Sequence, residues 1–513
     1  MKLSLRWFVA AASIALPLAA QEPQAEIPVI NESIDVRVVN VEAMVTGASG
    51  ERVGGLSAAD FRLLVDGVEV PVEYFSEIKE GTALDQAAKP AGAPMAPVAA
   101  GEEVGRSYLV YVDDSFSLAN KRNALLEKIE SDLALLRPAD QMAVLAFDSS
   151  HIDVLCGWTG DKAKLREALA RARQRPAKGG TQLAHQRALQ ADVDWVEISA
   201  DSLETGDSDR VGGIKVSEMD AILGELGKRI SPEARTQLGK TAVAVAAALR
   251  GFETPPGRKV MLLLSGAWSL SVAPQLYGPV VEAANRLGYT VYPVDAAQSD
   301  AAEVTVLDSL ARATGGRAVA AADNAVFRQV VEDSGTYYWL GFTPSWKAND
   351  QAHRVTVEVR RPGLTVRTRS GFSDLSRRTE TAIKAESVLL FGGTQEDRRL
   401  IVQLGETRKH GREIEVPVTL GVPVEALALT PQGNGYLAEV PLAVAAEDAS
   451  GRRIDLPGLK LKVLVAALPK AGTYARFQTT LRLREAGHRL VFTVEDPGSG
   501  HALWNEAELA SRK

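Results

Sequence analysis

Apolar runs of strand length alternate with segments of helical spacing through the middle of this chain. The runs include "SYLVYVDD" at 107–114, "QMAVLAFD" at 141–148, "RKVMLLLS" at 258–265 and "YTVYPVDA" at 289–296. Runs without polar alternation are typical of strands buried on both faces of a parallel sheet, and the segments between them are long enough for crossover helices. The sequence therefore predicts the α/β fold class, with an open, doubly wound, mostly parallel sheet over residues 105–336.

Sequence typical of β-structure flanks this central region on both sides. Residues 28–81 alternate apolar and polar side chains around glycine-containing turns, which predicts a small β-sandwich-like domain. Residues 82–104 are rich in Ala, Pro and Gly and are expected to form a linker. A β-hairpin extension is predicted at 337–376, and short alternating runs at 380–510 predict a C-terminal β-sandwich.

The first 20 residues have the features of a secretory signal peptide. Lys2 and Arg6 precede a short apolar run that ends in small residues. This run is shorter than the roughly 20 residues that a membrane-spanning helix requires. We therefore expect an exported protein, periplasmic or extracellular, without a transmembrane segment in the mature chain.

Polar side chains follow the first apolar run at every second position. Asp113, Ser115 and Ser117 come directly after the buried strand, where the chain enters a helical pattern. Ligands of open α/β sheets bind at the carboxyl ends of the strands, and small oxygen ligands suit a hard cation such as Mg²⁺. A simpler alternative is that Ser117 only caps the following helix.

The D-x-S-x-S element, together with Thr181 in "GGTQL", resembles the von Willebrand factor type A (VWA) domain and its metal-ion-dependent adhesion site. The runs "GLSAADFRLLVDG", "GRKVMLLLSG", "TVYPVDA", "ATGGRAV" and "YYWLGFTP" are similar to a bacterial family of secreted VWFA-related proteins. The resemblance implies a metal site formed by Asp113, Ser115, Ser117 and Thr181. Ser265 stands where the family has a second aspartate.

The replacement of that aspartate by Ser265 bears on how tightly a metal is held. A carboxylate about 5 Å from a divalent ion contributes on the order of 7 kcal/mol at an effective dielectric constant near 20, before desolvation offsets much of it. Asp114, Asp148 or Asp295 could compensate from neighbouring strand ends, as could a carboxyl group of the ligand. The expected cofactor is therefore weakly bound Mg²⁺, with Mn²⁺ or Ca²⁺ as alternatives.

Composition and motifs argue against several other functions. The formal charge of −7 provides no basic field for nucleic acid. The sequence contains no G-x-S-x-G, H-E-x-x-H, P-loop or dinucleotide-binding motif, so we expect no enzymatic activity. The favoured hypothesis is a non-enzymatic, exported binding protein that recognises an acidic residue of a protein partner through the metal. The alternative is a metal-independent structural or assembly scaffold of the cell envelope.

Overall fold

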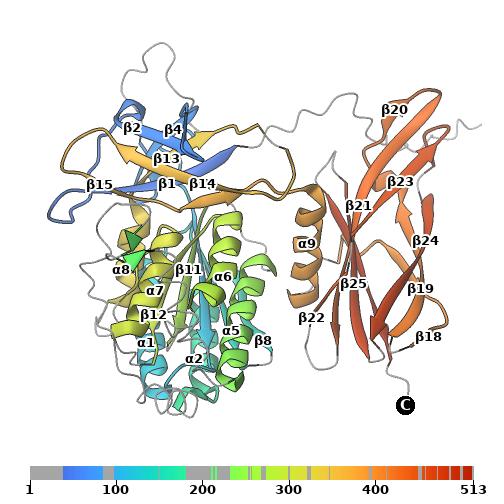
Figure 1. Cartoon of the computed structure of the whole chain (residues 1–513), viewed down its shortest axis with the longest axis horizontal. Coiled ribbons are helices and arrows are strands. Elements are labelled where there is room, and N and C mark those ends of the chain that lie inside the picture. Colours follow the sequence, from blue (N-terminus) through green and yellow to red (C-terminus); the bar gives the residue numbers. More distant parts are fainter. Residues whose placement is uncertain are drawn as a thin grey trace, which may run out of the picture.

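The structure is a computed structural model with two lobes (Figure 1). It describes residues 38–84, 98–149, 151–180, 210–211, 214–215, 232–251, 255, 257–266, 273–297, 301–319, 325–345, 347–391, 395–411, 413–448, 453–456, 458–470, 472–484, 487–496 and 501–510. The predicted signal peptide and most of the predicted linker lie outside these residues. In the part that is described, no helix combines the length and the apolar character needed to cross a membrane.

The prediction of a doubly wound α/β fold class is wrong for this chain, which is β-rich. About 45% of its residues lie in strands and about 26% in helices. Of the six sheets within the described ranges, one contains parallel strand pairs and the others are antiparallel. The prediction gave most weight to the apolar runs in the middle of the chain, whereas most strands lie before and after them.

The first lobe begins with a two-sheet sandwich, called here the first sandwich. One sheet has the order β15-β1-β13-β4-β5 and the other β16-β14-β2-β3. The bounds are β1 Val39–Thr46, β2 Phe61–Val65, β3 Val68–Val70, β4 Tyr74–Lys79, β5 Thr82–Ala83, β13 Tyr337–Phe342, β14 Ala352–Val359, β15 Thr365–Arg367 and β16 Gly371–Ser373, with a 3-10 helix at Ala58–Asp60. The sequence analysis placed 28–81 and 337–376 in separate units, but β13 pairs with both β1 and β4, so the two segments bury one shared core.

A mixed sheet, called here the central sheet, lies below the first sandwich in Figure 1. Its order is β12-β11-β6-β7-β8, and only the edge strand β8 is antiparallel. The bounds are β6 Arg106–Asp113, β7 Gln141–Phe147, β8 Ile152–Thr159, β11 Arg258–Ser265 and β12 Tyr289–Asp295. A separate two-stranded ribbon pairs β9 Arg210–Val211 with β10 Ile214–Lys215.

Helices cover both faces of the central sheet because its strands are apolar on both faces. In β6, Tyr108 and Val110 belong to one core cluster, whereas Leu109 and Tyr111 belong to the other. The first face packs against α1 Ala119–Ser131, α2 Lys162–Gln174 and α8 Val326–Gly335, with a 3-10 turn at Leu133–Leu135. The second face packs against α5 Pro232–Gly251, α6 Ala273–Leu287 and α7 Ala301–Ala313.

The strand order of the central sheet reverses beside β6. From β6 the chain continues to β7 on one side, and it later returns to β11 on the other side. In such sheets a crevice opens at the carboxyl ends of the two strands that flank the reversal. The amino ends face the first sandwich, since Arg258 at the start of β11 donates to Met44 Sδ of β1 at 3.3 Å. The strand ends at Asp113 and Ser265 therefore lie at the far edge of the central sheet.

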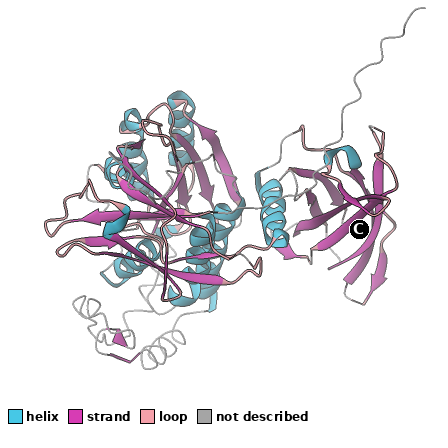
Figure 2. Ribbon diagram, turned by 90° about the horizontal axis from the view of Figure 1, so that it is seen from above, coloured by secondary structure: helices cyan, strands magenta, loops and turns pink. Residues whose placement is uncertain are grey.

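The second lobe is a β-sandwich with a helix on the side that faces the first lobe (Figure 2). Its strands are β17 Ile401–Leu404, β18 Arg408–His410, β19 Glu413–Pro423, β20 Thr430–Gln432, β21 Gly435–Asp448, β22 Arg453–Asp455, β23 Leu459–Val465, β24 Tyr474–Arg484, β25 His488–Glu495 and β26 Ala502–Leu509, with a 3-10 turn at Val424–Ala426. The helix α9 Arg377–Phe391 was not anticipated. It buries Ala385 and Leu389 against β21 and β25.

Candidate functional site

Three of the predicted site residues meet at the carboxyl ends of β6 and β11. Asp113 is the last residue of β6, and its Oδ2 accepts a hydrogen bond from Ser265 Oγ at 2.6 Å. Its Oδ1 accepts one from the backbone N–H of Ser115 at 2.9 Å. Each of these side chains is fully buried. The hydroxyl that replaces the expected aspartate therefore donates directly to the carboxylate of Asp113.

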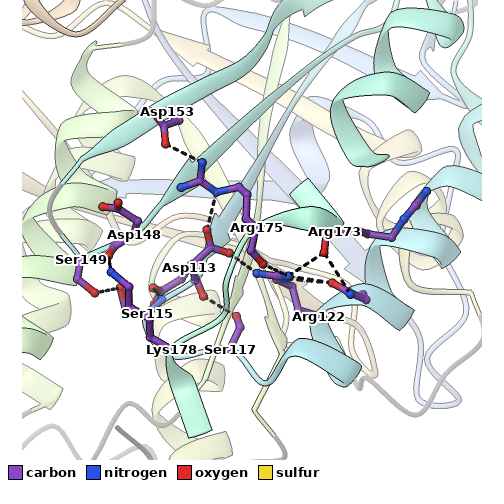
Figure 3. Close-up of polar contacts among 12 residues, drawn as sticks. Asp113, Ser115, Ser117, Arg122, Asp148, Ser149, Asp153, Arg173, Arg175 and Lys178 are labelled. Atoms are coloured by element: carbon purple, nitrogen blue, oxygen red, sulfur yellow. Dashed lines mark hydrogen bonds and ion pairs between the residues drawn. The ribbon is translucent and has the colours of Figure 1, made fainter. Parts of the chain in front are cut away.

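The other two hydroxyls of this cluster bond to its neighbours (Figure 3). Ser117 Oγ donates to the backbone carbonyl of Asp113 at 2.5 Å. It does not cap α1, whose N-cap is Leu118 without a side-chain cap bond. Ser115 Oγ lies 2.7 Å from Ser149 Oγ, in the loop that follows β7. Asp113, Ser115, Ser117, Ser149 and Ser265 are called the Asp113 cluster below.

Ser149 was missed by the sequence analysis. Its backbone has φ +86°, a left-handed conformation that is unfavourable for serine and that recurs at functional sites. The available signal was the "DSS" that follows the apolar run of β7 at the same sheet edge as Asp113. Serines are common in loops, and that signal alone is weak.

The two adjacent aspartates of the β6–α1 loop have opposite electrostatic surroundings. Asp114 forms ion pairs with Arg122 at 2.5 Å and with Arg175 at 2.6 Å, so its charge is already compensated. Asp113 has no cationic partner among the described residues and receives only hydroxyl and N–H donors. Burial, opposed by the hydrogen bond from Ser265, raises the pKa of Asp113 to about 6. An ionised Asp113 is therefore a buried charge that lacks a counter-ion.

The remaining predicted ligands are placed only in part. Thr181 lies outside the described residues. Gly179, two residues before it in the sequence, packs directly on the Ser117 backbone. Asp148 Oδ1 accepts from the N–H of His151 at 2.8 Å, and Asp295 Oδ1 accepts from the N–H of Ala297 at 2.9 Å. These two carboxylates thus bond to backbone N–H groups of their own loops.

The Asp113 cluster has the donor chemistry of a site for a hard divalent cation. Where the chain is described, no three His, Cys, Asp or Glu side chains are grouped to hold a metal. A cation at this edge would therefore be held by the Asp113 carboxylate and by the hydroxyls of Ser115 and Ser117. Mg²⁺ accepts such a set because it retains several water ligands and needs few groups from the protein. What such a cation would supply here is the positive charge that Asp113 lacks.

The contact between Gly179 and Ser117 gives a first testable prediction. A Cβ on Gly179 would lie 2.4 Å from the carbonyl oxygen of Ser117, which forces the backbone of the β6–α1 loop to shift. We expect Gly179→Ala to lower the free energy of unfolding by about 1–3 kcal/mol, as overpacking does. Gly180→Ala is the matched control, since its Cβ would meet only a Leu118 methyl group at 4.0 Å. Equal urea midpoints for the two variants would contradict this packing.

Comparisons with known proteins add little to this geometry. No family model and no curated protein matches the chain. Bacteroides uniformis β-glucuronidase 2, solved with cyclophellitol-6-carboxylate aziridine, is 12% identical over 22% of this chain and 13% of its own, with TM-score 0.15. An Archaeoglobus fulgidus protein is 12% identical over 22% of this chain and 96% of its own, with TM-score 0.14. Three N-terminal domains of a Porphyromonas gingivalis type V pilus tip protein are 10% identical over 94% of this chain and 78% of their own, with TM-score 0.23. This chain spans 13% of the length of the β-glucuronidase, and similarities this weak identify neither its fold nor its activity.

Proposed function

We propose that this chain is an exported, non-enzymatic binding protein that uses a weakly held Mg²⁺ at the Asp113 cluster to bind a carboxyl group of a protein partner. The observation that carries the proposal is the fully buried carboxylate of Asp113, which has no cationic partner among the described residues. Burying an ionised carboxylate without a counter-ion is unfavourable. A bound divalent cation would remove that cost.

The neutral hydroxyls around Asp113 explain why an external carboxylate would be the ligand. Ser115 and Ser117 contribute oxygen atoms without charge, so one carboxylate neutralises only half of a divalent cation. The residual positive charge favours an acidic side chain as the next ligand. The position also supports binding, because the Asp113 cluster lies where the strand order of the central sheet reverses.

A second candidate is a metal-independent scaffold, and one observation favours it. Both carboxylate oxygens of Asp113 and the hydroxyls of Ser117, Ser149 and Ser265 already have hydrogen-bond partners inside the cluster. Buried polar groups that are satisfied in this way stabilise a loop without any ligand. In that case the same loops would contact a partner through their outer surface alone.

Thermal unfolding with and without Mg²⁺ separates the two candidates. For the metal-dependent function we expect Mg²⁺ at about 100 times its dissociation constant to add about 2.7 kcal/mol to the free energy of unfolding. Ser117→Ala should abolish that increment because it removes a ligand oxygen. Ser131→Ala, at the exposed far end of α1, is the matched control and should keep it. If millimolar Mg²⁺ and Mn²⁺ leave the wild-type midpoint unchanged, the metal-independent scaffold is the better account.

A further inference from the structure

A cavity lies between the first sandwich and the amino edge of the central sheet, at the end opposite the Asp113 cluster. It has a volume of about 350 Å³ and is called here the junction cavity. Its walls come from β1, β13 and β16 of the first sandwich, from the start of β11, from the end of α6 and from the first turn of α9. Sites for small molecules concentrate at such junctions between structural units and are of this size or larger.

The charge of Arg369 dominates the wall of the junction cavity. The side chain is 8% exposed, and its guanidinium donates to the carbonyl oxygens of Asn285 at 2.9 Å and Asn40 at 2.6 Å. Both acceptors are neutral. Glu42 attracts the guanidinium through space, but within the described ranges no carboxylate forms an ion pair with Arg369. A guanidinium has five N–H donors, and its Nε–H has no acceptor here. Buried arginines are normally paired with an anion, so this one creates a positive wall.

Further N–H groups add to the positive potential of that wall. The indole N–H of Trp339 and the Nε–H of Arg286 are buried without an acceptor, and both residues line the junction cavity. Lys259 also lines it, with Nζ 3.0 Å from the carbonyl oxygen of Leu287. N–H dipoles without acceptors attract an anion through space even where their nitrogen atoms are not in contact with it. Asn40, which also lines the cavity, has a buried Oδ1 without a donor, and the charge of Arg286 is paired with Glu282. The excess of positive potential in this wall is therefore centred on Arg369.

The other lining residues limit which anion fits. Trp339, Leu287 and Phe372 give the junction cavity apolar surface, which favours a ligand with an apolar body. Glu42 and Glu380 also line it and would repel a dianion such as phosphate. From these observations we propose that the junction cavity binds a small organic monocarboxylate. This proposal does not depend on metal binding at the Asp113 cluster.

Calorimetric titration of the full chain with benzoate, in the presence of a chelator, tests this proposal. The chelator removes any carboxylate binding through a metal at the Asp113 cluster. We expect one benzoate per chain, and binding of the neutral isostere benzamide that is at least about tenfold weaker because Arg369 favours the charged group. Saturation by phosphate in place of benzoate would overturn the monocarboxylate assignment. Equal binding of benzoate and benzamide would overturn it too.

Two variants locate the binding site. Arg369→Gln removes the charge, and Arg312→Gln on the exposed surface of α7 is its matched control. Because Arg369 also bridges two structural units, Val38→Trp provides a second test by placing an indole in the cavity while keeping every charge. We expect both cavity variants to lose benzoate binding, and Arg312→Gln and Ser117→Ala to keep it. Wild-type benzoate affinity in a folded Val38→Trp variant would overturn the proposal.

Discussion

Ser265→Asp should destabilise the metal-free protein and make its stability strongly dependent on Mg²⁺. The new carboxylate would replace a hydroxyl that lies 2.6 Å from Asp113 Oδ2 inside a fully buried cluster. Two like charges about 4 Å apart repel by about 4 kcal/mol at an effective dielectric constant near 20. In chelator we therefore expect a lower unfolding midpoint than wild type. Mg²⁺ should restore most of that loss, because the cation is attracted by both carboxylates.

Ser265→Asn is the matched control for this experiment. The Asn side chain has the size and shape of Asp but carries no charge, so it tests the steric effect alone. Relative to wild type under the same condition, we expect the free energy of unfolding of Ser265→Asn to be lowered by a similar amount in chelator and in Mg²⁺. An equal response of the two variants to Mg²⁺ in denaturant unfolding would show that a carboxylate at position 265 does not act on a cation at the Asp113 cluster.

Asp333→Asn is predicted to have the second large effect, at the contact between the central sheet and the first sandwich. Asp333 at the end of α8 forms ion pairs with Arg52 and Arg367 and accepts a hydrogen bond from Tyr292 Oη at 2.7 Å. Removing one partner of a mostly buried ion pair leaves uncompensated charge, which costs about 3 kcal/mol. Asp308→Asn, which breaks an exposed pair with Arg312, should cost less than about 0.5 kcal/mol. Similar urea midpoints for the two variants would contradict this role of Asp333.

The pKa of Asp333 predicts how the stability of the protein changes in acid. Burial alone would raise the pKa of Asp333, but the guanidinium groups of Arg367 and Arg52 and the hydrogen bond from Tyr292 lower it below the usual 3.8. A carboxyl group whose pKa is lower in the folded than in the unfolded state stabilises the protein at any pH above its unfolded-state pKa. This contribution is lost as the pH falls through its folded-state pKa. The greater free energy of unfolding of wild type, relative to Asp333→Asn, should thus be lost below about pH 4. An advantage that is constant from pH 7 to pH 3 would contradict this linkage.

The local pattern of the sequence predicted the elements of the central sheet but not the fold of the chain. The apolar runs at 107–114, 141–148, 258–265 and 289–296 coincide closely with β6, β7, β11 and β12. Which strands pair across long sequence separations is not encoded locally. The insertion of β13 between β1 and β4 joins segments about 300 residues apart, and it turned two predicted units into one sandwich.

The candidate site was predictable from residues close in sequence and from the family resemblance, but its surroundings were not. Alternation placed Asp113, Ser115 and Ser117 at one locus, and the family resemblance added Ser265 from the end of another strand. The structure adds Ser149, from the loop after β7. The different surroundings of Asp113 and Asp114 could not be predicted. They depend on Arg122 in α1 and on Arg175 beyond α2, which meet Asp114 only after the helices have packed.

Binding of Mn²⁺, followed by electron paramagnetic resonance, tests most directly whether Asp113 is the centre of a cation site. Free Mn²⁺ gives a sharp spectrum that is lost on binding, so a titration reports both affinity and stoichiometry. We predict one weakly bound Mn²⁺ per wild-type chain, no such binding by Asp113→Asn, and unchanged binding by Asp308→Asn. If wild type and Asp113→Asn weaken the signal of free Mn²⁺ equally, the proposed site is contradicted.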